Sequence, residues 1–127
     1  MPLVFVYGTL KKGFPNHKLL GKDSKFIGTD TMLGALYFLG HRAFPYAFVS
    51  TPWFRSATDS RIHGEVYDID TETVRKLDDL EGHPNHYVRI ETKTDKGHNV
   101  HVYTASLWTY EHASWMEQIP RGNYDAC

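Results

Sequence analysis

Glu81 is the residue of this chain whose position most suggests chemistry. It falls in the last turn of a predicted helix that should begin at Asp70 or Thr71 and end at Gly82. At 100° per residue from Val74, Glu81 lies at about 340°, within the apolar stripe. Burial and the negative end of the helix dipole both disfavour its ionised form, so its pKa should rise. Such a carboxyl group suits general acid/base catalysis, and the alternative is an ordinary surface glutamate at a helix end.

The rest of this helix supplies the pattern that the interpretation depends on. Leu77 and Leu80 fall in the same stripe as Glu81, whereas Asp79 points to solvent. Pro84 follows the predicted end of the helix and reinforces the stop. The pattern therefore predicts a carboxylate facing the protein interior.

A second candidate site follows the first predicted strand, Leu3–Tyr7. A glycine at a strand end lets successive N–H groups converge on a carboxylate or an oxyanion, and a threonine hydroxyl adds a donor. An ordinary glycine turn is the simpler alternative. The residues of this candidate loop are Tyr7, Gly8, Thr9 and Leu10. Two further tyrosines, Tyr87 and Tyr103, stand just after Glu81 and in the last predicted strand, where a phenol could orient a polar ligand.

Other kinds of site find little support. The chain has no glycine-rich phosphate loop, dinucleotide fingerprint or Gly-x-Ser-x-Gly elbow. Histidines 98 and 101 would point to opposite faces of a strand, and the pair at 83/86 lies in a loop without a third ligand. Surface or hydrogen-bonding histidines are therefore expected rather than a metal site. The single cysteine is Cys127, the last residue, which is a poor place for a nucleophile. We expect neither a metal nor a cofactor.

Length and charge narrow the class of protein. The 127 residues predict one domain spanning 1–127, and the net charge of -1, from 14 basic and 15 acidic residues, argues against a nucleic-acid partner. A small-molecule substrate is more plausible. No apolar run approaches about 20 residues, so no membrane span is expected. The absence of an internal disulfide fits a reducing compartment, and we expect a cytoplasmic protein.

Strands outnumber helices in the predicted element order. Strands are expected at Leu3–Tyr7, Lys25–Thr29, Met32–Leu39, Ala43–Val49, Ile62–Ile69, Tyr87–Thr94 and Val100–Trp108, with a hairpin turn at 95–98. Short helices are expected at Pro15–Leu20, capped by Asn16 and stopped by Gly21, and at Ala113–Gln118, while 50–61 should form a loop. This order predicts an α+β fold, a small mixed or antiparallel β-barrel flanked by helices.

Two motifs together resemble the gamma-glutamylcyclotransferase-like superfamily, and within it the gamma-glutamylaminecyclotransferase branch that includes plant AIG2-like proteins. The first is Val-Phe-Val-Tyr-Gly-Thr-Leu-Lys-Lys-Gly at 4–13, followed by Pro15-Asn16-His17. The second is Leu-Asp-Asp-Leu-Glu-Gly at 77–82, followed by Tyr87-x-Arg89. The resemblance extends from residue 3 to Ala105, and Asn123-Tyr124-Asp125 is similar to a segment near the end of the amine-specific branch.

The resemblance implies roles for the candidate residues. Glu81 matches the catalytic acid/base, and the Tyr7–Leu10 loop matches the substrate-binding turn, with Thr9 where serine is common. Tyr87 and Tyr103 match pocket tyrosines. Arg89 is similar to the arginine of the Tyr-x-Arg pattern, and a structural ion pair is its alternative role.

The implied reaction closes a ring within the substrate. The α-amine of a γ-glutamyl group attacks its own γ-carbonyl, which gives 5-oxoproline and a free amine without metal, nucleotide or other cofactor. The amine is lysine if the substrate is γ-glutamyl-ε-lysine. Other γ-glutamyl amides or γ-glutamyl amino acids are alternative substrates, and a catalytically silent protein that binds a small carboxylate or a protein partner is the rival function.

Overall fold

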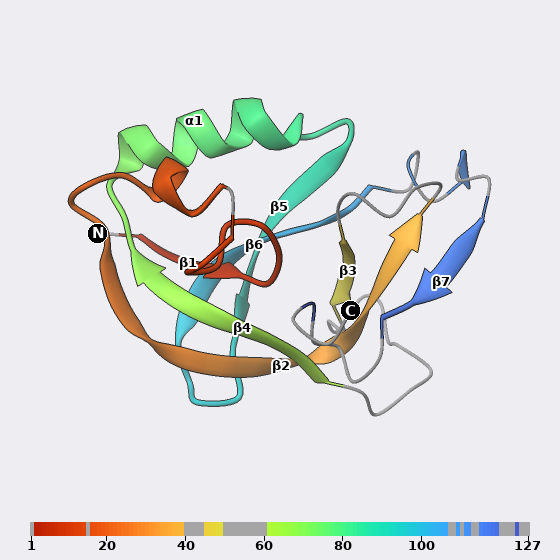
Figure 1. Cartoon of the computed structure of the whole chain (residues 1–127), viewed down its shortest axis with the longest axis horizontal. Helices are drawn as coiled ribbons and strands as arrows, with labels where there is room; N and C mark the ends of the chain where they lie inside the picture. The colour runs from red at the N-terminus through yellow and green to blue at the C-terminus, as the bar shows by residue number, and fades with distance from the viewer. Residues whose placement is uncertain are drawn as a thin grey trace.

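A computed structural model describes residues 2–14, 16–39, 45–49, 61–106, 109, 111–112, 115–119 and 124. Within these ranges the chain forms one α-helix, one 3-10 helix and seven strands (Figure 1). The strands are β1 (Leu3–Val6), β2 (Lys25–Leu39), β3 (Tyr46–Val49), β4 (Arg61–Asp68), β5 (Tyr87–Lys93), β6 (Asn99–Ala105) and β7 (Met116–Gln118). The helices are α1 (Thr71–Glu81) and η1 (His17–Leu20).

The strands form one curled mixed sheet in the order β3-β2-β4-β1-β6-β5, with β7 paired to β2. Strand β1 pairs antiparallel with β4 and parallel with β6. Its side chains are buried on both faces, because Val4 and Val6 join the core cluster that contains α1 residues, whereas Phe5 joins the other cluster. Helix α1 lies across one side of the curl (Figure 1). The predicted α+β fold with a curved mixed sheet is confirmed, although one α-helix flanks the described part of the sheet.

Helix α1 begins and ends where its capping residues predict. The Asp70 side chain accepts a hydrogen bond from the Thr73 N–H (2.7 Å), and Gly82 adopts the left-handed conformation (φ 66°). Leu77 is buried, but Leu80 is 50% exposed, so its placement in the stripe was wrong. On the predicted helical wheel the buried face centres on Val74 at 0° and Glu81 at about 340°. Leu80, at about 240°, falls outside this face.

Strand β2 is one element of 15 residues, not the two predicted strands. Its glycines interrupt pairing rather than the strand. The register with β4 shifts between Phe26 and Gly28, and at Gly34 the partner changes from β4 to β3. A side chain at Gly34 would lie 2.5 Å from the Phe48 carbonyl oxygen, so glycine permits the close approach of β3.

The predicted helix at Ala113–Gln118 was also wrong, because Met116–Gln118 form β7 against β2. All three residues of β7 are exposed, so the strand has no alternating burial that a sequence pattern could reveal. The predicted loop at 50–61 lies outside the described residues except for Arg61, which begins β4. The first residues predicted for β3, 43–44, and the last predicted for β6, 107–108, also lie outside them.

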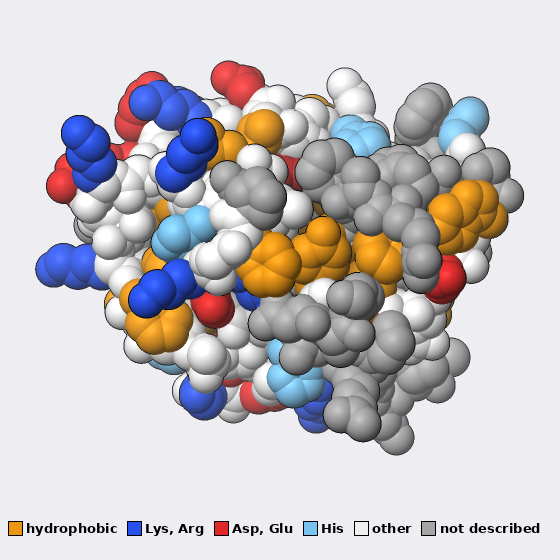
Figure 2. Space-filling model, viewed as in Figure 1, with side chains coloured by type: hydrophobic (Ala, Val, Ile, Leu, Met, Phe, Trp, Pro, Cys, Tyr) orange, Lys and Arg blue, Asp and Glu red, His pale blue; other side chains and the backbone are white. Residues whose placement is uncertain are grey.

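The surface carries charges of both signs. Figure 2 shows basic and acidic side chains intermixed at the end of the molecule where α1 begins, rather than a patch of one sign. In the part of the chain that the structure describes, no helix is long and apolar enough to cross a membrane.

Candidate active site

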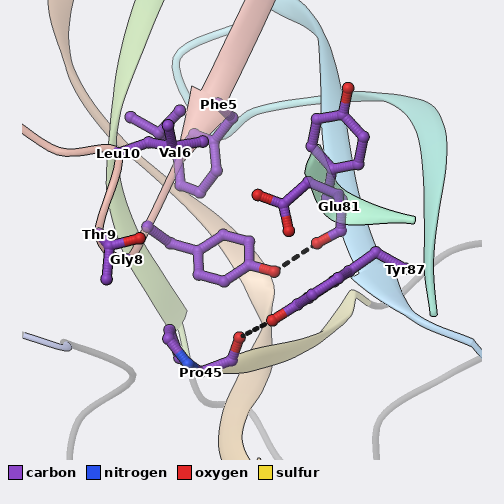
Figure 3. A pocket seen from close by; sticks show the side chains of 10 residues that line it. Phe5, Val6, Gly8, Thr9, Leu10, Pro45, Glu81 and Tyr87 are labelled. Carbon is purple, nitrogen blue, oxygen red and sulfur yellow. Dashed lines mark hydrogen bonds between the residues drawn. The ribbon is translucent and has the colours of Figure 1, made fainter. Parts of the chain in front are cut away.

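The two candidate sites of the sequence line one pocket. It lies between the end of β1, the last turn of α1 and the facing parts of β5 and β6 (Figure 3). Its lining residues are Phe5, Val6, Tyr7, Gly8, Thr9, Leu10, Pro45, Glu81, Tyr87 and Tyr103. All seven residues predicted from the sequence as catalytic or substrate-binding are therefore brought together around one pocket.

Glu81 contributes the ionisable carboxyl group of this pocket. Its carboxylate points into the space between Phe5 and Tyr87 (Figure 3). Burial raises the pKa of Glu81 to about 7. The position of Glu81 at the C-terminal end of α1 acts in the same direction, since the helix dipole disfavours a negative charge there. A carboxyl group with this pKa can both accept and donate a proton near neutral pH.

Three tyrosines hold the walls of the pocket together. The Tyr7 hydroxyl donates to the Tyr103 carbonyl, and the Tyr87 hydroxyl donates to the Pro45 carbonyl (2.9 Å). Burial raises the pKa of each of the three phenols above its usual value. The rings therefore stay neutral near pH 7, and in the described part of the lining Glu81 is the group that titrates there.

The loop of Gly8, Thr9 and Leu10 lines the same pocket. Among the described residues, none of the N–H groups of Gly8, Thr9 and Leu10 donates to a protein acceptor. A side chain at Gly8 would lie 2.7 Å from Pro45 Cγ, so glycine lets the loop pack against that ring. Free N–H groups beside a titrating carboxyl group can bind an anionic ligand and stabilise a developing oxyanion.

Arg89 lies outside the pocket lining and forms an ion pair. Its Nε atom is 2.8 Å from Asp78 Oδ1, which also accepts a hydrogen bond from the Tyr103 hydroxyl (2.7 Å). Two histidine nitrogens, His83 Nδ1 and His101 Nδ1, contact the Arg89 main-chain N–H and its guanidinium. The geometry favours the ion-pair role over direct contact with a ligand in the pocket.

Asp78 and Pro45 contribute to the site but were not predicted. Asp78 lies at about 40° on the same helical wheel, so its place on the inner face of α1 was available as a signal. Pro45 reaches the pocket only through the pairing of distant strands, which no local pattern reveals. The histidines make hydrogen bonds as expected, and the described residues contain no group of three His, Cys, Asp or Glu that could hold a metal.

Comparison with known structures defines the class of fold. A protein from Pyrococcus horikoshii superposes with a TM-score of 0.73 at 28% identity, covering 98% of this chain and 91% of that one. An AIG2-like protein from Mus musculus gives a TM-score of 0.70 at 24% identity, covering 97% and 93%. The curled sheet and its flanking helix are therefore those of the AIG2-like fold.

Sequence comparison then identifies the family. The model of the family described as gamma-glutamyl cyclotransferase, AIG2-like, matches residues 4–126, and the chain belongs to this family. The gamma-glutamylaminecyclotransferase of Rattus norvegicus is 31% identical over 140 residues, covering 99% of this chain and 91% of the relative. The protein is thus an enzyme of the gamma-glutamylcyclotransferase type, with a small γ-glutamyl compound as its substrate.

Proposed function

We propose that this enzyme is a gamma-glutamylaminecyclotransferase that converts γ-glutamyl-ε-lysine to 5-oxoproline and lysine. Glu81 is its general acid/base, and the loop of Tyr7, Gly8, Thr9 and Leu10 binds the γ-glutamyl group. The proposal rests on one observation above all, that the Glu81 carboxyl group shares a pocket with a loop whose Gly8, Thr9 and Leu10 N–H groups donate to no acceptor among the described residues. Similarity to the rat enzyme along almost the whole chain supports the choice of the amine-specific reaction.

The reaction requires two proton transfers and no outside reagent. The substrate's α-nitrogen loses two protons as it forms the new C–N bond to the γ-carbonyl carbon, and the leaving nitrogen gains two as the amide bond breaks. Ionised Glu81 accepts the first proton from the α-ammonium group, which frees the nitrogen lone pair for attack. The protonated carboxyl group then donates this proton to the leaving nitrogen as the amide bond breaks. The same carboxylate accepts the second proton from the new ring nitrogen and passes it to the departing amine, which leaves as an ammonium ion.

The pocket also restricts how the substrate folds. N–H groups of the loop bind the α-carboxylate, so the substrate is held at the end that carries the attacking nitrogen. The apolar walls formed by Phe5, Val6 and Tyr87 leave the extended chain little room, which favours the bent conformer needed for ring closure. In this way binding lowers the entropy cost of the reaction.

Replacing Glu81 by glutamine tests the proposed role. The Glu81→Gln variant keeps the shape of the side chain but cannot accept a proton, so the rate of 5-oxoproline release from γ-glutamyl-ε-lysine should fall by about 10²–10⁴-fold. The Asp79→Asn variant is the matched control, since this exposed residue of the same helical turn should leave the rate unchanged. A Glu81→Gln variant as active as the wild type would exclude the acid/base role.

A panel of substrates tests the proposed leaving group. γ-Glutamyl-ε-lysine should be converted with a higher kcat/KM than γ-glutamyl-alanine or glutathione when each is supplied at equal concentration. Preference for one of the latter would keep the family reaction but correct the substrate. Thermal stabilisation by 5-oxoproline without turnover of any member of the panel would instead indicate a binding protein.

A further inference from the structure

Asn16 and His17 contact the backbone of the pocket loop from outside the pocket. The Asn16 main-chain N–H donates to the Thr9 carbonyl (3.0 Å), and the Asn16 side-chain amide donates to Thr9 Oγ1 (2.9 Å). The Nδ1 atom of His17 lies 2.9 Å from the Leu10 carbonyl oxygen. Because a carbonyl oxygen can only accept, His17 Nδ1 must carry a hydrogen. Neither residue is part of the pocket lining.

These contacts fix the direction of two peptide units. The carbonyl and the N–H of a trans peptide unit point in opposite directions, so the bond to the Thr9 carbonyl turns the Leu10 N–H to the opposite side. His17 donates to the Leu10 carbonyl, which belongs to the next peptide unit along the chain. The N–H of that unit is the Lys11 N–H, and it donates to the Gly8 carbonyl (3.0 Å). The Gly8 carbonyl and the Thr9 N–H belong to one trans peptide unit, so this bond directs the Thr9 N–H to the side opposite the carbonyl.

We propose that Asn16 and His17 are positioning residues that hold the Thr9 and Leu10 N–H groups ready for the substrate's α-carboxylate. The inference rests on the proposed function, in which the loop binds that carboxylate. Asn16 has a second effect through the Thr9 side chain. Since the Asn16 amide occupies Thr9 Oγ1 as a donor, the hydroxyl hydrogen of Thr9 remains available to a ligand.

Two substitutions of His17 separate its hydrogen bond from its packing. The His17→Phe variant keeps a ring beside Tyr67, whose centroid lies 5.4 Å away, but cannot donate to Leu10. It should raise both the KM of γ-glutamyl-ε-lysine and the Kd of 5-oxoproline about tenfold, with kcat changed less than about threefold. The His17→Asn variant places an amide donor where Nδ1 lies, and it should restore both constants to within about threefold of wild type. Unchanged constants in a folded His17→Phe variant would overturn the proposal.

The tautomer of His17 provides a test that needs no variant. In ¹⁵N NMR spectra of the wild-type protein, the His17 ring should carry a hydrogen on Nδ1. Hydrogen on Nε2 alone would overturn the proposal, because Nδ1 could then not donate to the Leu10 carbonyl. This measurement decides the matter if His17→Phe fails to fold.

The Asn16→Asp variant tests the second effect. An aspartate cannot donate to Thr9 Oγ1 and would instead accept the hydroxyl hydrogen, so Asn16→Asp and Thr9→Val should each raise the Kd of 5-oxoproline. The double variant should bind no more weakly than Asn16→Asp alone, because both changes remove the same donor from the ligand. Losses that add in the double variant would show that the Thr9 hydroxyl is not held for the ligand by Asn16.

Failure of the proposed function would look different from failure of this inference. Wild-type protein that binds 5-oxoproline but cyclises no γ-glutamyl compound would exclude the proposed reaction and leave the positioning of the loop intact. Wild-type protein that cyclises γ-glutamyl-ε-lysine, with His17→Phe binding and reacting equally well, would exclude only the positioning role.

Discussion

At the scale of single residues, the property that makes Glu81 suitable for catalysis also reduces stability. The folded protein raises the pKa of Glu81 from 4.5 to about 7, so the folded state binds this proton more tightly than the unfolded state. The stabilising contribution of the protonated group is fully present below about pH 4.5 and is lost as the pH rises through about 7. At physiological pH much of this stabilising contribution is lost, because a large fraction of Glu81 is ionised.

The Glu81→Gln variant should reveal this cost as a change in the free energy of unfolding. As the pH rises from 5 to 8.5, the free energy of unfolding of the variant should increase relative to that of wild type by at most about 3 kcal/mol. This limit follows from about 1.36 kcal/mol per pKa unit. Urea unfolding at the two pH values measures the difference, with Asp79→Asn as the control. Parallel pH dependence of Glu81→Gln and wild type would contradict the raised pKa.

The pH dependence of catalysis should follow the same group. In the proposed mechanism Glu81 must be ionised to accept the first proton, so kcat/KM for γ-glutamyl-ε-lysine should rise with pH through about 7. Initial rates of 5-oxoproline release between pH 5 and pH 8 measure this limb. A limb centred near pH 4.5 would mean that the carboxyl group titrates as if it were exposed.

At the scale of elements, local signals predicted α1 and the loop better than the extent of the strands. Asp70 and Gly82 act through hydrogen bonds with near neighbours in sequence, so their positions could be recognised without the fold. Glu81 was found from helical periodicity and the glycine after β1 from its position at a strand end, which are local patterns as well. Strand β7 could not be predicted, because its existence depends on a free edge of β2 rather than on its own residues.

The ion pair between Arg89 and Asp78 joins β5 to the turn of α1 that precedes Glu81. The Arg89→Met variant would leave the Asp78 carboxylate, whose side chain is 20% exposed, without its cation and should lower the free energy of unfolding by about 1–3 kcal/mol. The Arg75→Met variant is the control, because the Arg75 and Glu72 side chains are 75% and 65% exposed and their pair should contribute about 0–1 kcal/mol. Equal effects of the two substitutions, measured by chemical unfolding, would contradict this assignment.

At the scale of the whole molecule, β2 joins the parts of the curled sheet, since it pairs with β4 along its first part and with β3 and β7 along its second. The sequence predicted separate strands at Lys25–Thr29 and Met32–Leu39, and only the three-dimensional pairing shows that Gly34, where the partner strand changes, needs to be glycine. We also propose that residues 1–127 form a single domain, which should unfold in one calorimetric transition.

Two glycine substitutions in β2 test the importance of the point where its partner changes. Gly34→Ala places a methyl group 2.5 Å from the Phe48 carbonyl oxygen and should lower the free energy of unfolding by about 2–4 kcal/mol. Gly28→Ala is the matched control, since a side chain there meets no atom within 4 Å and should change stability by less than about 0.5 kcal/mol. Equal melting temperatures of the two variants would contradict the steric role of Gly34.

The hydrogen bond from the Tyr7 hydroxyl to the Tyr103 carbonyl also constrains when the enzyme can first work during its synthesis. Residue 7 leaves the ribosome long before residue 103, and the strand that carries Tyr103 must emerge before it can pair with β1. At about 5–20 residues per second, synthesis of the chain between residues 7 and 103 takes on the order of 5–20 seconds. A nascent chain therefore exposes the proposed binding loop well before it can bring the Glu81 carboxyl group and all of the pocket tyrosines together.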